Sequence, residues 1–428
     1  MTQVKTFSKF LLSLLVRVLI AILAGALLLT AVYLLPTASM EDHLAESAAT
    51  FEKEGTYPVL FSWCTSQLDN YTDAIILQNA AHNSGENVLT QAMAVQRHSI
   101  GDLDPASSLV HHYAHGEAFD TEEPYYQYWH GYLLYAKPLL LLTDYNGIRI
   151  VNTVVQLGLL AVLIFLLWKK DMKQYILPYL VAVAFLMPMA MAKSLQFTSC
   201  YCIFTIGSIT LLLMKDRLEA KEAYIFLFLG IATSYFDFLT YPMATLGVPA
   251  VLYCCMRQRT TAGETLFKGI KLCFSWAVGY IGMWAGKWLL GSLVIGGNVL
   301  SAATEALTER SSLTGVQGDN PILNLYVSLM VNVKSFITTP VTLLMAVAVI
   351  VLLVLLIRTM RKHKPAFVDL VRGLFPFVVL ACLPLVWYLA TTNHSIIHYW
   401  FTNKALIVSV LAAMCALVKV RSEISETA

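Results

Sequence analysis

The chain has 428 residues, of which 57% are hydrophobic and only 13% charged, and its formal net charge at pH 7 is +2. A soluble domain carries about a quarter charged residues, so this composition excludes an ordinary soluble globular protein. Apolar runs of roughly the 20 residues that a helix needs to cross a bilayer recur along the chain. The alternating segments of about 10 residues that are typical of membrane β-barrels are absent from the sequence. We therefore predict an all-α, polytopic membrane protein.

Ten apolar segments follow one another along the chain. The first, after Lys5 and Lys9, is longer than the apolar core of about 7–15 residues in a signal peptide, so we expect an uncleaved helix. The ten predicted spans are 10–35, 147–168, 175–193, 199–214, 222–237, 242–256, 270–291, 336–357, 367–390 and 403–418. Basic residues in short loops mark the cytoplasmic side. With the N-terminus inside, 20 of the 29 basic residues lie inside and 19 of the 27 acidic residues outside. This pattern predicts a multi-pass protein of the cell membrane with both termini cytoplasmic and its active side extracytoplasmic.

Two long outside loops are predicted, at 36–146 and 292–335, within a single membrane domain. In the first loop, the apolar stretch Tyr132–Leu142 is too short to span and is expected to form a re-entrant or interfacial helix. The inside loops are short and lack a P-loop, which argues against a nucleotide-binding domain, and nothing in the sequence points to nucleic acid. Seven of the eight cysteines lie in apolar segments and no CxxC pair is present, so we expect no disulfide framework.

The first loop contains the sequence Gln67–Asp73 at the start of a predicted helix that continues to Ala81. Asp69 and Asp73 are four residues apart, so a helix would place them on one face. Such a pair can hold a divalent cation, or one carboxylate can act as a base that the other orients. The alternative is that an acidic residue only caps the helix. A divalent cation is therefore a candidate cofactor, with its ligands unknown.

Aromatic residues are dense just before the interfacial helix, over Tyr125–Tyr132. Tyr128, Trp129 and His130 are candidate substrate ligands, because the apolar faces of sugar rings pack on aromatic rings. The alternative is the aromatic belt that forms at a membrane interface without any ligand.

Four charged residues are predicted near or within the membrane. Arg149 and Lys137 could bind a lipid phosphate, for which arginine offers a bidentate clamp, or could extend to ordinary headgroups. Asp237 lies between two predicted spans and Lys287 lies inside one. A charge at that depth costs about 2.5–3.5 kcal/mol unless it faces a polar cavity or a partner, so both are functional candidates. An ion pair between Asp237 and Lys287 is the structural alternative.

The third outside segment, Thr391–Lys404, contains His394 and His398. These two histidines would share a helical face and could bind a metal or phosphate oxygens. No carboxylate lies between them, so the zinc signature is poor. The three histidines within 111–115 of the first loop are expected to be solvated loop residues.

The order of these features resembles the GT-C superfamily of integral membrane glycosyltransferases: a first span, a long external loop with acidic residues, a helix on the membrane and then many spans. The resemblance implies transfer of a sugar from a polyprenyl-phosphate donor to an acceptor hydroxyl on the outer face. The sequences Gln67–Asp73, Tyr128–Leu133, Asp144–Asn152 and His394–Thr402 are also similar to those of a group of Gram-positive membrane proteins associated with surface-polysaccharide genes. Many GT-C enzymes carry an adjacent acidic pair at a particular place, and no such pair sits at that place in this chain unless Glu41-Asp42 fills it.

The resemblance implies the acidic role for Asp69 and Asp73 and contact with the donor phosphate for Arg149 or Lys287, and the residue patterns described above supply the other candidates. Asp69 or Asp73 would act as the catalytic base. The donor phosphate would be bound by Arg149, Lys287 and His398. The substrate-binding residues would be Tyr128, Trp129, His130, Asp237, His394 and Tyr399.

We therefore expect a bacterial membrane glycosyltransferase that transfers a sugar, with inversion, from a lipid-linked donor to a cell-surface glycan or lipid acceptor. Two alternatives stay open. The first is a transporter or flippase for a lipid-linked or anionic solute, in which Asp237 and Lys287 line a pathway. The second is a non-catalytic membrane component of a polysaccharide assembly complex.

Overall fold

The computed structural model describes residues 2–215, 217, 221–257, 262–296, 299–314 and 318–426. Over these residues the chain is almost entirely helical, which confirms the all-α prediction. The two short strands β1 (Gln96–Ser99) and β2 (Thr121–Pro124) pair antiparallel as a small ribbon.

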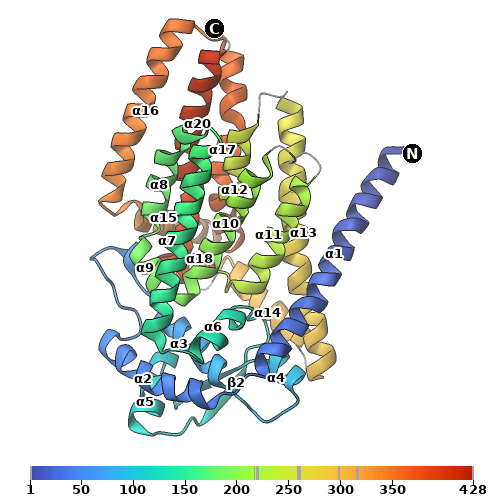
Figure 1. Ribbon diagram of the computed structural model, residues 1–428, viewed down its shortest axis with the longest axis vertical. Coiled ribbons are helices and arrows are strands. Elements are labelled where there is room, and N and C mark those ends of the chain that lie inside the picture. Colours follow the sequence, from blue (N-terminus) through green and yellow to red (C-terminus); the bar gives the residue numbers. More distant parts are fainter. Residues whose placement is uncertain are drawn as a thin grey trace.

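Seven helical segments in the described part of the chain are long and apolar enough to cross a membrane. They belong to α1 (Thr2–Tyr33), α7 (Tyr145–Lys169), α10 (Leu195–Leu213), α13 (Ala262–Ile295), α16 (Val341–His363), α17 (Phe367–Ala390) and the run α19 (Tyr399–Thr402), η4 (Asn403–Leu406) and α20 (Ile407–Glu426). Figure 1 shows most of these long helices side by side in one bundle. Each of the seven overlaps a predicted span, so the class of polytopic helical membrane protein is supported.

The other three predicted spans fall on shorter helices, so the number ten stays a prediction. The segment 175–193 is divided into η2 (Lys173–Tyr175), α8 (Ile176–Phe185) and α9 (Pro188–Lys193). The break comes at Met187, whose φ is 53°, because the proline that follows it disfavours helical geometry at the preceding residue. The segments 222–237 and 242–256 form α11 (Glu222–Phe236) and α12 (Met243–Met256), which are connected through Asp237.

The segment between α1 and α7 folds into a set of short elements at one end of the bundle (Figure 1). We call residues 36–146 the loop module. Its elements are α2 (Ala38–Glu54), η1 (Cys64–Ser66), α3 (Asn70–Ala81), α4 (Val88–Ala94), β1, α5 (Pro105–His115), β2 and α6 (Leu133–Leu140). The short α6 lies where an interfacial or re-entrant helix is predicted, and α3 begins at the predicted position.

The segment expected as a second long loop, 292–335, contains α14 (Val299–Ser311) and most of α15 (Pro321–Ile337). Asn320 starts α15 by accepting hydrogen bonds from the Ile322 and Leu323 amides, both at 3.1 Å. The buried face of α15 is polar and its exposed face apolar. Buried polar residues are Asn324, Ser328, Asn332 and Ser335, whereas Ile322, Leu323, Tyr326 and Met330 are exposed. This inverted pattern is expected of a helix whose outer face contacts lipid.

Helices α11 and α13 approach each other closely through two glycines. A Cβ atom at Gly230 would overlap the carbonyl oxygen of Trp276, and one at Gly279 would overlap that of Leu227. Small residues allow such backbone contact between helices in a membrane. Both helices also contact α1.

Two buried lysines connect the long helices to the loop module. The Lys287 ammonium in α13 donates to the Met93 carbonyl in the last turn of α4, at 2.8 Å. The Lys404 ammonium in η4 donates to the Thr65 carbonyl of η1, also at 2.8 Å. Carbonyls in the last turn of a helix lack intrahelical partners and attract cations. The module is therefore attached to the bundle by charged hydrogen bonds as well as by apolar packing.

Candidate functional site

Asp69 and Asp73 lie together at the start of α3, which the loop module buries against α7 and α10. Asp69 is the N-cap residue of α3, and its carboxylate accepts a hydrogen bond from the Thr72 amide at 3.0 Å. Asp73 lies in the first turn. Both side chains are almost fully buried, with 2% and 0% exposed. Asp69 therefore caps α3, as the alternative interpretation predicts. A cap does not require two buried carboxylates at one helix end, because burial of a charged group is costly.

The Asp73 carboxylate is occupied by hydrogen bonds. It accepts from the Tyr145 hydroxyl at 2.6 Å and from the backbone amides of Leu195 and Gln196 at 2.9 and 3.0 Å. These amides are the first two of α10, where a helix has free N–H groups and a positive dipole end. Burial nevertheless raises the pKa of Asp73 to about 6. Because both oxygens already have donors, Asp73 is suited to joining α3 to α10 rather than to proton transfer or metal binding.

Arg149 is the centre of a second buried network. Its guanidinium forms a bidentate ion pair with Glu54 through two contacts of 2.8 Å. It also donates to the Lys193 carbonyl at 2.8 Å, the Tyr145 hydroxyl at 2.9 Å and the Asn70 side chain at 3.2 Å. All three guanidinium nitrogens are therefore engaged with protein groups. The geometry favours a role for Arg149 in joining α2, α3, α7 and α9, and it does not support the expected contact with a donor phosphate.

Asp69 differs from Asp73 in having few partners. Burial raises its pKa to about 7, with a smaller contribution from the charge of Asp73, although the Thr72 amide and hydroxyl and the Trp400 indole work in the opposite direction. The Trp400 indole N–H faces the Asp69 carboxylate without reaching hydrogen-bonding geometry. A carboxylate that is partly ionised at neutral pH and has spare acceptor capacity is suited to act as a general base.

Tyr57 and Trp400 lie near Asp69, and Tyr71 and Arg97 are connected to them by further contacts. The Tyr57 ring stacks on Tyr71 with centroids 6.1 Å apart and meets Trp400 edge-on at 5.4 Å. The Arg97 guanidinium donates to the Tyr71 hydroxyl at 2.9 Å. We call these five residues, Asp69, Tyr57, Tyr71, Arg97 and Trp400, the Asp69 cluster. Tyr57 is 42% exposed, so the cluster reaches the surface of the module.

The predicted aromatic ligands are packed into the interior instead. The Trp129 indole donates to the Met283 carbonyl, and Tyr128 and Trp129 are 4% and 1% exposed. His130 contacts the Tyr125 carbonyl through Nε2 and the Tyr132 hydroxyl through Nδ1, and burial lowers its pKa to about 3. A neutral ring that donates from Nε2 and accepts at Nδ1 satisfies both contacts. These residues therefore support the fold, and a direct role in sugar binding stays a prediction.

The two charges expected at membrane depth also have local partners. Asp237 accepts from the Thr240 amide at 2.9 Å and from the Thr240 hydroxyl. Lys287 donates to Met93, as described above, and lies 5.8 Å from the centre of the Trp129 ring. Within the described residues neither joins an ion pair, so the structural alternative of an Asp237–Lys287 pair is not formed.

His394 and His398 lie on α18 (Thr392–Ile397) and at its C-terminal end, with ring centroids 4.8 Å apart. His394 contacts the Leu239 carbonyl through Nε2 at 2.8 Å. The buried Nδ1 of His398 has no hydrogen-bond partner among the described residues, and its ring lies 5.3 Å from Trp400. Burial, followed by the charge of Arg310, lowers the pKa of His398 to about 4. A neutral His398 with a free nitrogen beside the Asp69 cluster is well placed to bind a ligand, and Tyr399 next to it is partly exposed.

Arg310, at the end of α14, is a cation that the sequence did not single out. Its guanidinium donates to the Tyr128 hydroxyl at 2.7 Å and to the Ala306 carbonyl at 3.1 Å. Across the described part of the chain no carboxylate lies within ion-pair distance of it. The charge of Arg310 acts on both His394 and His398. Arg310 is therefore a better candidate than Arg149 for an anionic ligand.

Two cavities stand out, and neither is lined by Asp69 or Asp73. One of about 480 Å³ lies in the loop module near the end of α3. The other, of about 850 Å³, is mainly apolar and lies between α12, α13, α17 and α20 at the opposite end of the bundle. Neither of these two cavities is therefore a substrate channel to the Asp69 cluster.

The fold and these contacts define a polytopic helical membrane protein with a polar, aromatic-rich module at one end. No protein family, no curated protein and no solved structure matches the chain. The function is therefore argued from the site itself.

Proposed function

We propose that this protein is a membrane glycosyltransferase whose active site is the Asp69 cluster. The donor is a polyprenyl-phosphate-linked sugar, and the acceptor is a hydroxyl of a cell-surface glycan or lipid on the extracytoplasmic side. Asp69 takes the proton from the acceptor hydroxyl, whose oxygen attacks the anomeric carbon. The bond from that carbon to the phosphate oxygen breaks, and polyprenyl phosphate leaves. Attack opposite the leaving group inverts the anomeric configuration.

The environment of Asp69 carries the proposal. Its pKa of about 7 matches the operating range of a general base at neutral pH, and its carboxylate keeps acceptor capacity that Asp73 has lost to α10. Tyr57 and Trp400 offer ring faces beside it on which a sugar can pack. The three features occur together around a buried carboxylate, and Tyr57 extends from them to the surface of the module.

Arg310 and His398 support the second part of the proposal, binding of the donor phosphate. A guanidinium that has no carboxylate partner in the described ranges and a neutral imidazole with a free nitrogen can both donate to phosphate oxygens. Such donors stabilise the charge that develops on the departing phosphate. Arg310→Gln should therefore lower transfer while leaving the acceptor side of the site intact.

The test is a transfer assay with the purified full chain and a panel of polyprenyl-phosphate hexoses and N-acetylhexosamines. Asp69→Asn keeps a capping side chain but removes the base, so transfer should fall by about 10²–10⁴-fold. Asp104→Asn is the matched control, because Asp104 caps α5 in the same module through the Ala106 and Ser107 amides. Wild-type transfer by Asp69→Asn would reject Asp69 as the base. Solute flux in proteoliposomes without any glycosylated product would instead favour a transporter.

A further inference from the structure

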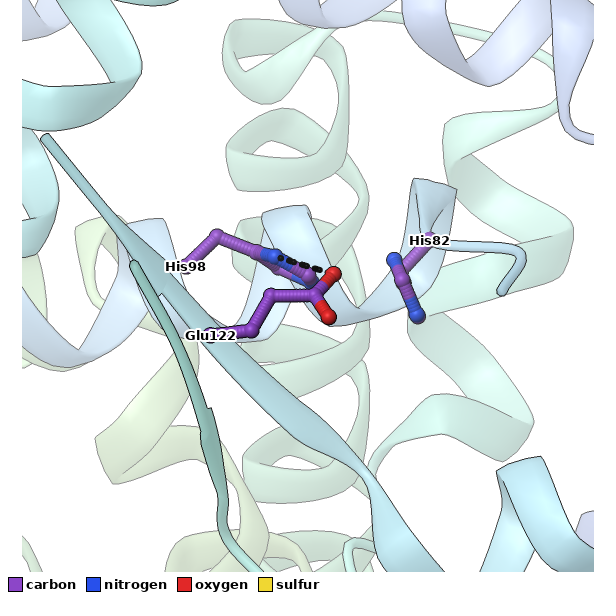
Figure 2. A group of neighbouring side chains, drawn as sticks. All are labelled: His82, His98 and Glu122. Atoms are coloured by element: carbon purple, nitrogen blue, oxygen red, sulfur yellow. Dashed lines mark ion pairs between the residues drawn. The ribbon is translucent and has the colours of Figure 1, made fainter. Parts of the chain in front are cut away.

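Three side chains of the kinds that bind metals meet at the end of α3 opposite Asp69. They come from separate elements: His82 is the C-cap residue of α3, His98 lies on β1 and Glu122 lies on β2. One potential ligand atom of each lies within 4.8 Å of the other two. Figure 2 shows the Glu122 carboxylate beside the imidazole rings of His98 and His82.

The β-ribbon positions two of these residues. His98 and Glu122 are direct partners in the antiparallel register, so their side chains emerge on the same face of the ribbon. The His98 Nδ1 lies 3.3 Å from a Glu122 carboxylate oxygen, and the His82 and His98 rings are 4.3 Å apart. Packing of the ribbon against α3 therefore brings together residues that are up to 40 positions apart in the sequence.

Unsatisfied polar atoms point to a missing ligand. The Nε2 atoms of both His82 and His98 are buried and have no hydrogen-bond partner among the described residues. The Gln78 side-chain oxygen, one turn before His82 on α3, is also buried without a partner in the same described set. Buried polar atoms are normally paired, and several unpaired atoms on residues that line one cavity call for an explanation such as a bound ion or water.

The surroundings leave room for such a ligand. The cavity of about 480 Å³ is lined by His82, His98, Glu122 and Gln78, together with Asp120. A metal held by the first three residues would keep a coordination position open toward this cavity for water or an exogenous ligand. Sites with three protein ligands and one open position are typical of accessible zinc.

We propose that His82, His98 and Glu122 bind a divalent transition-metal ion of the zinc class. Two imidazoles and one carboxylate suit zinc and its first-row neighbours, whereas Ca²⁺ and Mg²⁺ prefer oxygen ligands alone. The ion ties the β-ribbon to the C-terminal end of α3. Because Asp69 caps the other end of α3 and β2 leads directly to Tyr125, the ion fixes two parts of the module relative to each other. This site is separate from the Asp69 cluster and does not depend on the proposed transferase activity.

Metal binding by the full chain in detergent tests the proposal. After chelator treatment and dialysis, the protein is titrated with Zn²⁺ against a chromophoric chelator, and separately with Co²⁺ while visible absorption is recorded. The wild type should bind one equivalent of either metal and show ligand-field bands with Co²⁺. Glu122→Gln should weaken Zn²⁺ binding by about tenfold or more, a loss at least as large as that from altering an outer partner of a metal ligand.

The matched control is Glu123→Gln, which changes the neighbouring exposed carboxylate on β2 outside the cluster. It should bind Zn²⁺ as the wild type does. Glu122 is itself largely exposed, with 55% of its side chain accessible, so Glu122→Gln should fold normally. His82→Gln is the second variant, and Zn²⁺ at the same concentration should raise the melting temperature of the wild type more than that of either ligand variant. Binding by both ligand variants at wild-type affinity, or no measurable binding by the wild type, would overturn the proposal.

Discussion

The ion pair between Glu54 and Arg149 makes a strong stability prediction. Glu54→Gln keeps the shape of the side chain but removes the only carboxylate that contacts Arg149 within the described residues. The guanidinium, with 6% of its side chain exposed, would remain buried with neutral partners: Asn70, Tyr145 and the Lys193 carbonyl. The cost arises mainly from this uncompensated charge.

The magnitude follows from the geometry. Breaking a fully buried pair costs about 3–5 kcal/mol. The Glu54 side chain is 21% exposed, and the amide oxygen of the substituted glutamine can still accept one of the two hydrogen bonds, so we expect a smaller loss of about 2–3 kcal/mol. For a chain of this size such a loss lowers the melting temperature by about 2–3 °C.

The assay is thermal unfolding of the purified protein in detergent, followed by loss of the monodisperse peak in size-exclusion chromatography. Glu52→Gln, on an exposed position of the same helix, is the matched control and should melt with the wild type. Equal melting temperatures of Glu54→Gln and Glu52→Gln would refute the reasoning.

The dependence on pH provides a second check. Burial works against ionisation of Glu54, but the hydrogen bonds and charge of Arg149 outweigh it and hold the pKa of Glu54 below its ordinary value of 4.5. A carboxylate with a lowered folded pKa stabilises the fold above its unfolded pKa, and this contribution is lost as the pH falls through the folded pKa. The difference between wild type and Glu54→Gln should therefore be full at neutral pH and shrink below pH 4.5.

Two further predictions concern Asp69 and the contact between α11 and α13. The pKa of Asp69 is raised from 3.8 to about 7, so ionisation of this carboxylate destabilises the folded state as the pH rises through this range. Asp69→Asn should therefore melt at a higher temperature than the wild type at pH 8. The difference between the two melting temperatures should disappear as the pH falls toward 3.8. Equal melting temperatures of Asp69→Asn and the wild type at pH 8 would contradict the conclusion that this carboxylate is buried and weakly paired. Gly230→Leu should abolish the monodisperse folded protein, because the new side chain would overlap the Trp276 backbone. Gly158→Leu on α7 should be tolerated, because the space beside Gly158 is open. Similar behaviour of the two glycine variants would show that the close approach is not needed.

The sequence predicts well those features that depend on neighbouring residues. Long apolar runs identify helices such as α1 and α7, and the Gln67–Asp73 pattern locates the start of α3. The break at Met187 could be anticipated from Pro188 alone, but the surrounding apolar residues mask it. The helix α15 was missed because its inward face carries Asn324 and Asn332, which read as loop residues when burial is assumed to be apolar.

The partners of buried charges could not be predicted, since they depend on contacts between distant segments. The spacing along the chain does not link Glu54 to Arg149, and this pair occupies the guanidinium that is expected from the sequence to bind a phosphate. The same limit applies to Arg310, whose importance comes from its position beside Tyr128 and His398. His82 and His98 were also overlooked, because a metal site built from a helix end and a ribbon has no local signature.

The contact of Lys404 with Thr65 has a consequence for biogenesis. Thr65 is translated early and Lys404 near the end of the chain, so η1 lacks this ammonium partner until the last long segment has been inserted. During most of synthesis, η1 therefore lacks its hydrogen bond to the long helices. Folding of the loop module is thereby coupled to insertion of the final helix. In a chain that stops after α17, the module would lack the Lys404 contact and would be open to proteolysis.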